Sequence, residues 1–426
     1  MKNPVSVRRS VSTPLALLAV ASAAAAQSAQ GTLEQRLESL EQRFGTAAQG
    51  EGSSRGGSLL EVFRGAQVLY TPHRGLTISA QDAEEFSINL GGQVQAGYQW
   101  IEDDTITASN SAFSVRSARV RLSGNVYSKD VTYFVQMDPS TGADLVDAWA
   151  GWRVIEPINI RFGQQKMRSS LQADTSLADT DLEMVDRSIA TLAFAGQRAT
   201  GVLLEGNAAE GKLNWHAGLM NNGTAGIDGV AAAAPLSGAG LLALAGPFAT
   251  GQQVGTDTLG WTVGGSFGSD AGNSETWSEG NLAHDEKVRW IAGATLTSVN
   301  ESLANGGDAM TVNLFGGVKL AKGLAGQFES SLRDNDDLNR DDSGFYGQVS
   351  YTLAKTGKIQ WGGVLRYGFI DFDGPEATEI AGGVNAYYEG HDLKTQIQVR
   401  SIQVDNAAGT EVSDTTSIDL LFTLVF

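Results

Sequence analysis

Apolar and polar side chains alternate with a period of two through most of the chain, from residue 86 to the last residue. In the stretch FSINLGGQVQAGYQW, for example, apolar and aromatic residues occupy one face and polar residues the other. Successive side chains of a strand point to opposite faces, so each such stretch predicts a strand with one apolar face. About sixteen of these stretches follow one another with no helical pattern between them. Their centres lie near residues 93, 120, 134, 149, 162, 203, 216, 264, 292, 315, 328, 349, 364, 383, 398 and 421.

The connections between these strands predict their arrangement. Counted from the first strand, odd-numbered connections tend to be long and polar, as in RDNDDLNRDDSG, and even-numbered ones tend to be short, as in IEP and AAEG. Long loops at one end and tight turns at the other are typical of outer-membrane barrels with an even strand number. The predicted fold class is therefore all-β, a transmembrane antiparallel β-barrel of about 16 strands. Residues 268–286 are long where a short turn is expected, which leaves open a strand count that differs by one hairpin.

The last ten residues, SIDLLFTLVF, form the final strand of this pattern. Phe426, Leu424, Phe422 and the alternate residues before them give a purely apolar face, which we expect to contact lipid. We expect this strand to pair with FSINLGGQVQ, because an open sheet edge in hydrocarbon leaves backbone groups without hydrogen bonds. Outer-membrane barrels commonly end on an aromatic residue that the assembly machinery recognises, so Phe426 is predicted to be the assembly signal.

The residues before the barrel predict export and a short helix. Basic residues precede a short apolar run that ends in three alanines, which is the pattern of a secretory signal peptide over residues 1–26. Residues 27–50 are predicted to form a short coiled-coil helix, because leucines and a phenylalanine recur at heptad-like spacing in LEQRLESLEQRF. Residues 51–85 are predicted to be a linker and pre-barrel segment, and residues 86–426 the barrel.

Composition excludes several classes of protein. The chain contains no cysteine, so it has no disulfide framework and no thiol chemistry. The signal peptide holds three of the 30 basic residues, which leaves 27 against 48 acidic residues, and this acidic balance argues against nucleic-acid binding. The 4 histidines are scattered without metal-ligand spacing or a convincing nucleophile partner. We therefore expect no metal, no cofactor and no enzymatic activity.

Strand parity predicts which charged side chains face the inside of the barrel. Basic residues dominate this set, whereas most acidic residues fall in the long loops. The inward residues are Arg119, Arg121, Asp147, Arg153, Asn159, Arg161, Gln165, Arg289, Lys319, Arg366, Lys394 and Arg400. Rings of basic side chains at a constriction favour anions by Coulomb attraction in a reduced dielectric. The alternative is that each arginine only pairs with a neighbouring carboxylate, such as Arg153 with Asp147. Lys166 has outward parity near a strand end, where a position at the membrane interface competes with a position in the pore.

The chain also carries, in this order, FSINLGGQVQAGYQW, VRSARVRLSG, VDAWAGWRVIEPINIRFGQQK and VDRSIATLAFAGQRATGVLLEG. These motifs resemble those of the phosphate-selective porin O and P family. The resemblance implies a sixteen-stranded homotrimeric porin whose third long loop folds into the lumen and whose arginines guide anions. That loop would span residues 167–199 and bring Arg187 and Arg198 into the pore. The chain departs from the family at Ser117, where the family has an arginine, and at Met167-Arg168-Ser169, where it has Glu-Pro-Phe.

These features favour an outer-membrane porin that allows passive diffusion of small hydrophilic solutes. We expect a weak preference for phosphate-like anions, because the third loop carries five acids: Asp174, Asp179, Asp181, Glu183 and Asp186. Two other classes stay open, a structural envelope protein that tethers the outer membrane through residues 27–50, and a barrel enzyme. The expected partners are outer-membrane lipid, the barrel-assembly machinery and small anions. Residues 229–248 could be a loop against a neighbouring protomer or lipid, a plug, or a low-complexity loop.

Overall fold

The computed structural model describes twelve ranges of the chain: residues 66–71, 74–79, 86–104, 106–141, 144–175, 180–196, 198–221, 259–269, 277–284, 286–299, 309–335 and 339–426. The predicted signal peptide, the predicted coiled coil and residues 229–248 lie outside these ranges. The barrel, apart from the end of β6, belongs to one compact unit of residues 63–153 and 157–426.

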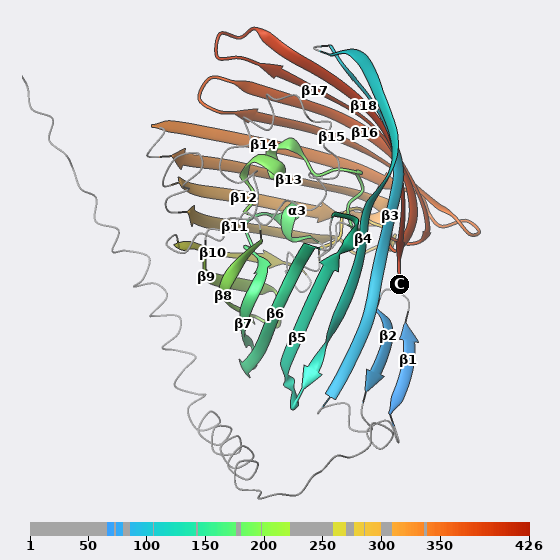
Figure 1. The fold of residues 1–426 in the computed structure, drawn as a ribbon, viewed down its shortest axis with the longest axis vertical. Coiled ribbons are helices and arrows are strands. Elements are labelled where there is room, and N and C mark those ends of the chain that lie inside the picture. The colour runs from blue at the N-terminus through green and yellow to red at the C-terminus, as the bar shows by residue number, and fades with distance from the viewer. Residues whose placement is uncertain are drawn as a thin grey trace, which may run out of the picture. The chain divides into compact units, whose positions relative to one another are not determined.

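Sixteen antiparallel strands, β3 to β18, close into a barrel in which each strand neighbours the next along the chain and β18 pairs with β3 (Figure 1). Their bounds are β3 (Phe86–Asp103), β4 (Ile106–Val126), β5 (Ser128–Asp138), β6 (Asp144–Ile155), β7 (Ile158–Lys166), β8 (Arg198–Ala208), β9 (Leu213–Asn221), β10 (Leu259–Gly268), β11 (Arg289–Val299), β12 (Ala309–Lys319), β13 (Leu324–Asn335), β14 (Arg340–Thr352), β15 (Gln360–Asp371), β16 (Glu376–Glu389), β17 (Leu393–Asp405) and β18 (Glu411–Val425). Every predicted strand centre falls within one of these strands, which confirms the predicted fold class.

The two ends of the barrel differ, as the connection lengths predict. We call the end that carries the tight turns and Phe426 the turn end, and the opposite end the loop end. The helices in the described ranges are short: α3 (Leu171–Asp174), α4 (Ile189–Phe194) and the 3-10 turns η1 (Pro139–Thr141) and η4 (Ala321–Gly323). No helix among the described residues is long and apolar enough to cross a membrane.

A small hairpin precedes the barrel in the predicted pre-barrel segment. Strands β1 (Gln67–Thr71) and β2 (Gly75–Ser79) pair with each other, and β2 continues onto the edge of β3 by pairing Leu76 with Leu90 and Ser79 with Ser87. Each of these strands has five residues. Such short strands give too few alternating positions for a period of two to stand out from the sequence.

The barrel closes where β18 meets β3. Val425 pairs with Gln93 and Thr415 with Asp103, so the partner of the last strand is residues 93–103. The predicted partner FSINLGGQVQ was correct in the strand and wrong in the register, because β2 occupies part of the β3 edge before Gln93. Phe426 completes the seam, since its N–H donates to the Gly92 carbonyl (2.9 Å) and its own carbonyl accepts from Gly92 N–H (2.7 Å).

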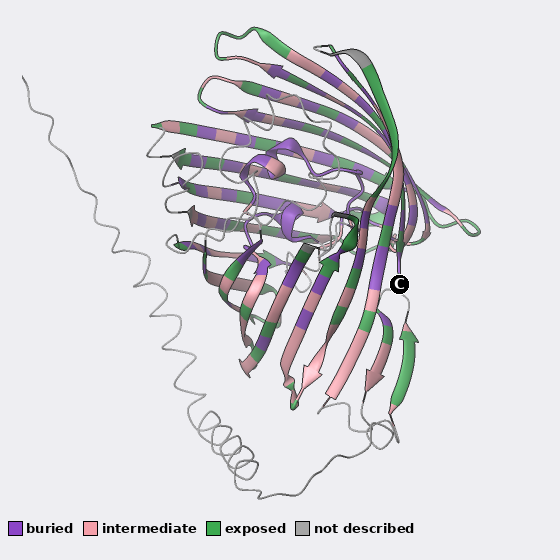
Figure 2. Cartoon of the chain, viewed as in Figure 1, coloured by how far each residue is buried: buried purple, intermediate pink, exposed green. Residues whose placement is uncertain are grey.

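The strands show the predicted alternation of exposure (Figure 2). In β18, Ile418, Leu420, Phe422 and Leu424 are exposed on the outer face, whereas Asp419 and the other alternate residues are buried. An outer band of apolar side chains is what a barrel in a bilayer requires. The inner faces carry the polar and charged side chains, and their contacts define the candidate site.

Candidate functional site in the lumen

The connection between β7 and β8 folds into the barrel rather than away from it. We call residues 167–197 the third loop; Figure 1 shows its helices α3 and α4 inside the ring of strands. Most of its described side chains are buried. The predicted inward fold of this loop is therefore what the structure has, and most of its contacts are with the inner faces of β12 to β18, which we call the covered wall.

A buried glutamate on the covered wall fixes the start of α3. The carboxylate of Glu329 in β13 accepts the backbone N–H groups of Leu171 (3.0 Å) and Gln172 (2.6 Å) and the hydroxyl of Tyr346 (2.8 Å). The first N–H groups of a helix have no partner within the helix, so an acceptor from the wall satisfies them. The Ser170 side chain adds the N-cap by accepting from Ala173 N–H.

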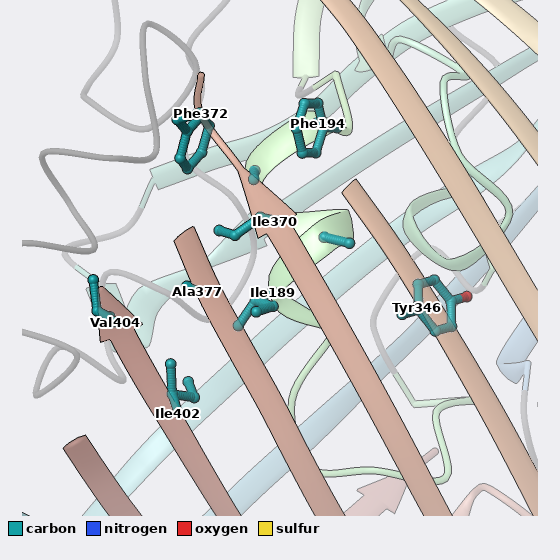
Figure 3. Close-up of a cluster of buried hydrophobic side chains, with 10 residues drawn as sticks. Ile189, Phe194, Tyr346, Ile370, Phe372, Ala377, Ile402 and Val404 are labelled. Carbon is teal, nitrogen blue, oxygen red and sulfur yellow. The ribbon is translucent and has the colours of Figure 1, made fainter. Parts of the chain in front are cut away.

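Helix α4 is held by apolar packing. Ile189, Ala193 and Phe194 pack with residues from four strands of the covered wall (Figure 3). The wall residues of this cluster are Tyr346, Ile370, Phe372, Ala377, Ile402 and Val404. Burial of an isoleucine or phenylalanine side chain contributes about 1.5–3 kcal/mol, so this contact is a substantial part of what keeps the loop in place.

A network of ion pairs joins the middle of the third loop to strands β4, β16 and β17. Asp186 forms ion pairs with Arg116 (2.7 Å) and Arg400 (3.3 Å), and Arg400 also contacts Glu379 (2.8 Å). Burial opposes ionisation of Asp186, but Arg116 and Arg400 outweigh it and lower its pKa to about 2. Asp186 is therefore a carboxylate at neutral pH, and its charge is neutralised by the wall.

Arg366 completes this network from β15. Its guanidinium contacts Glu379 (2.7 Å) and donates to the backbone carbonyls of Asp186 (2.7 Å) and Arg187 (3.3 Å). Glu379 in turn accepts the N–H of Ile189 at the start of α4 (3.0 Å). The side chains of Arg366 and Glu379 are both 0% exposed. This arginine therefore holds the loop and is not open to solvent.

A second insert enters the lumen from the opposite end of the barrel. The connection between β10 and β11, whose length breaks the alternation of loops and turns, does not form an extra hairpin in its described residues. Residues 277–284, which we call the turn-end insert, instead place Glu279 against the third loop, where its carboxylate accepts from Gln172 (2.8 Å) and from Glu183 N–H (2.7 Å).

The inner faces of β4 to β8, which we call the open wall, keep more contact with solvent. Arg153 and Asp130 form a loose pair at 4.0 Å with side chains 39% and 24% exposed. Arg161 (2.6 Å) and Arg168 (2.8 Å) bind the two oxygens of a single carboxylate, that of Glu205. The guanidinium of Arg161 also stacks on the Trp149 ring, 4.7 Å from its centroid.

Two further arginines of the open wall are buried and paired one to one. Arg119 contacts Asp138 (3.1 Å), and Arg198 contacts Asp147 (2.9 Å). Arg121 differs from both, because its guanidinium bonds the amide oxygen of Gln93 (3.4 Å) and has no carboxylate partner among the described residues. A cavity of about 180 Å³ adjoins the Glu205 pair, between the ends of β7, β8 and β9.

Parity thus places the predicted arginines inside the barrel but does not predict their partners. Arg153 pairs with Asp130 rather than with Asp147, which pairs with Arg198. Lys166 is not at the membrane interface; its amine donates to the Ala173 carbonyl (2.6 Å), because the chain turns inward at this residue. Two other predicted residues lie apart from the carboxylate pairs described above: Arg187, which donates to the Ala173 carbonyl (3.4 Å), and Arg289, opposite Lys319 at the turn end.

Three important residues are missing from the predicted set. Arg116 is the extra residue of a β-bulge, where Gln95 faces Ser117 and Ala96 faces Val115, so it does not follow the alternation of its strand. Arg333 and Asp342 form a buried pair at the loop end, although Asp342 belongs by sequence to an acidic loop. The Arg333 guanidinium also donates to the Ala193 carbonyl (3.2 Å) and stacks on Phe194, 4.9 Å from its centroid. The signal for Arg333 was its inward parity in β13.

A closed antiparallel barrel with an apolar outer band, a charged inner wall and an inward-folded loop defines the class of outer-membrane porins. A family model for the phosphate-selective porins O and P matches residues 88–425, and the chain belongs to this family. Its fold and family are those of channel proteins of the outer membrane. No curated relative is recognisable by sequence comparison.

Solved structures share the fold at low sequence identity. The anion-selective porin from Comamonas acidovorans aligns with a TM-score of 0.52 and 12% identity, over 80% of this chain and 100% of that chain. The outer membrane channel DcaP of Acinetobacter baumannii aligns with a TM-score of 0.52 and 13% identity, over 80% and 98%. OprB of Pseudomonas putida aligns with a TM-score of 0.52 and 8% identity, over 80% and 94%.

Proposed function

We propose that this porin passes small hydrophilic solutes by passive diffusion with a weak preference for anions, and that it has no enzymatic activity. The observation that carries the proposal is the charge of the open wall. Arg161 shares the carboxylate of Glu205 with Arg168 of the third loop, and Arg121 bonds the amide oxygen of Gln93. The open wall therefore presents the guanidinium groups of Arg121 and Arg161 to the lumen, and positive charge there favours anions.

The preference is weak because most other charges are compensated. Arg119, Arg153 and Arg198 each face one aspartate, and Asp186 of the third loop is neutralised by two arginines. Salt screens an exposed charge over about 8–10 Å at physiological ionic strength, so only the arginines close to the permeation path act on an ion. The name of the Comamonas porin, anion-selective, supports the same sign.

The proposal includes the cellular setting that the sequence predicts. Residues 1–26 direct export and are removed, and the apolar outer band then contacts outer-membrane lipid. The assembled form is a homotrimer, as membership in the family implies. Chemical cross-linking in native outer membranes tests this point: bands at three times the barrel mass support it, and monomers alone overturn it.

Reversal potentials in a salt gradient across a planar bilayer test the selectivity. We expect stepwise conductance with a small anion preference for the native protein. The double variant Arg121→Ala, Arg161→Ala should lose that preference. The control variant Lys129→Ala removes a cation from the outer face of β5 and should keep it. A sealed bilayer would overturn the porin itself. A native cation preference, or an unchanged reversal potential in the double variant, would overturn the arginine-lined path.

A further inference from the structure

The turn-end insert is fixed to the covered wall by its own contacts. Trp277 packs on the buried cluster of Leu171, Ile291 and Phe315, and its indole lies over Gly317, where a side-chain β-carbon would approach the ring to 2.6 Å. Only glycine leaves room for this contact. Further along, Asn281 donates to the Leu320 carbonyl (2.5 Å), and the Leu282 carbonyl accepts from Gln360 (3.0 Å). These bonds hold the backbone on both sides of Glu279.

Glu279 links this insert to the third loop. Two of its donors belong to the loop, the Gln172 amide (2.8 Å) and the Glu183 N–H (2.7 Å), and two belong to the covered wall, the amides of Gln327 (2.7 Å) and Gln348 (2.9 Å). The carboxylate is 1% exposed. A buried carboxylate with four donors is fully satisfied, and the loss of any donor leaves a costly unpaired group.

The backbone of the insert repeats this link. Glu279 N–H donates to the Asp181 carbonyl (3.1 Å), and the Glu279 carbonyl contacts Nε2 of His391 in the β16–β17 turn (3.0 Å). The next residue, Gly280, has a φ of +73°, and a β-carbon there would lie 2.3 Å from Oε1 of Glu183. The backbone at Gly280 therefore lies against the Glu183 side chain, and a side chain at position 280 would displace it.

We propose that the turn-end insert is a second constriction element, and that Glu279 is the positioning residue that holds the third loop in place from the opposite end of the barrel. The width of the channel is then determined by two segments, the third loop from the loop end and the insert from the turn end. The other attachments of the third loop hold it from the side, at the covered wall, and Glu279 adds a contact from the turn end that reduces the number of positions the loop can sample. This inference rests on the proposed function, because a bore has meaning only in a conducting channel.

The first test replaces Glu279 in the full-length protein. Glu279→Ala should raise the unitary conductance in a planar bilayer and add low-frequency noise, since the loop loses two of its hydrogen bonds to the insert and keeps only the backbone bond at Asp181 and the Trp277 contact. Glu279→Gln keeps the shape and one acceptor oxygen, and should give an intermediate value. The matched control is Glu286→Ala, which removes an exposed acid from the same connection and should conduct like the native protein.

The second test uses the absence of cysteine from the native sequence. The double variant Glu183→Cys, Gly280→Cys places two thiols where the insert and loop meet, with either single variant as its control. We expect a disulfide to form in the folded protein, with near-native conductance when oxidised and a higher, noisier conductance after reduction. Heat-modifiable migration in electrophoresis identifies which variants have folded.

The outcomes separate the two proposals. If the native protein does not conduct, the proposed function is wrong. If it conducts and folded Glu279→Ala has native conductance and noise, the positioning role of Glu279 is wrong while the porin stands. Failure of the cysteine pair to cross-link in folded protein, or a cross-linked channel that does not respond to reduction, equally overturns the second constriction.

Discussion

The covered wall and the open wall of the barrel carry the same kinds of charged residue, but the exposure of these residues and their contacts differ between the two walls. On the covered wall, Arg366 and Glu379 are 0% exposed and Arg400 is 4% exposed, and all three contact the third loop or its partners. On the open wall, Arg153 is 39% exposed and Arg161 is 17% exposed. Both sets face inward by parity. Arg366 and Glu379, which contact the third loop, are the most completely buried of these residues, whereas Arg119 and Arg198 of the open wall are buried against aspartates.

Inward parity therefore predicts where an arginine side chain lies but not whether it acts on a permeating ion. An arginine beneath the third loop is a structural group, because its desolvation is compensated only by carboxylates and carbonyls in fixed positions. An arginine on the open wall keeps much of its hydration and can act on a passing ion. The two walls should therefore respond in opposite ways to the same substitution.

The largest effect is expected from Arg366→Ala on the covered wall. The change leaves Glu379 with one fewer cation and removes two donors from the loop backbone. Removal of one partner of a buried pair costs about 3–5 kcal/mol. We expect a lower urea midpoint and a large loss of correctly assembled barrel, measured by heat-modifiable electrophoresis.

The matched substitution on the open wall is Arg153→Ala. Exposed ion pairs contribute about 1 kcal/mol or less, and this pair is already 4.0 Å apart. The variant should unfold close to the native urea midpoint. Equal urea midpoints for Arg366→Ala and Arg153→Ala would contradict the view that arginines beneath the third loop are structural and that Arg153 is not.

A smaller effect is expected at the seam where the covered wall joins the open wall. Phe426 exchanges two backbone hydrogen bonds with Gly92 and places its ring over that residue. Phe426→Ala keeps the backbone bonds and removes the ring that we predict the assembly machinery recognises. Outer-membrane levels should fall under mild envelope stress, measured by quantitative blotting. Phe426→Tyr retains an aromatic ring and should assemble normally; unchanged levels in Phe426→Ala would count against the assembly signal.

The smallest effect is a pH dependence confined to the covered wall. Burial raises the pKa of Glu183 to about 8, and nearby Glu279 acts in the same direction. A raised pKa means that the neutral acid suits the folded state, so this stabilisation is complete below about pH 4.5 and is lost as the pH rises through about 8. Channel noise should therefore increase between pH 6 and 9.

The variant Glu183→Gln carries a permanently neutral side chain at this position. Its noise should stay constant over the same pH range, while selectivity, which depends on the open wall, stays as in the native channel. An identical pH response in Glu183→Gln and the native protein would show that another group is responsible.

The barrel could be predicted from the sequence because its information is local and periodic. A strand needs only its own alternation, and a tight turn needs only a few residues, so the sixteen strands and both ends of the barrel follow from short windows. The same reasoning finds the last strand and its partner. It misses the register of that pair, because the position of β2 on the edge of β3 depends on five-residue strands with no clear pattern.

The lumen could be predicted only in part. Parity places Arg119, Arg161 and Arg366 inside, and the family motifs indicate the inward third loop. The bulge that turns Arg116 inward shifts the alternation by one residue, from Phe113 and Val115 to Val120 and Leu122, and the long β10–β11 connection is visible only as an exception.

The sequence by itself determined the fold class and the arrangement of neighbouring strands, because the first depends on the period of two and the second on the lengths of the connections. The tertiary structure alone decided which arginine meets which carboxylate and where the two inserts touch. Those contacts join residues far apart in the chain, such as Glu279 with Glu183 and Arg400 with Asp186. They depend on how the closed barrel brings distant strands around one lumen, and no short window of sequence carries that geometry.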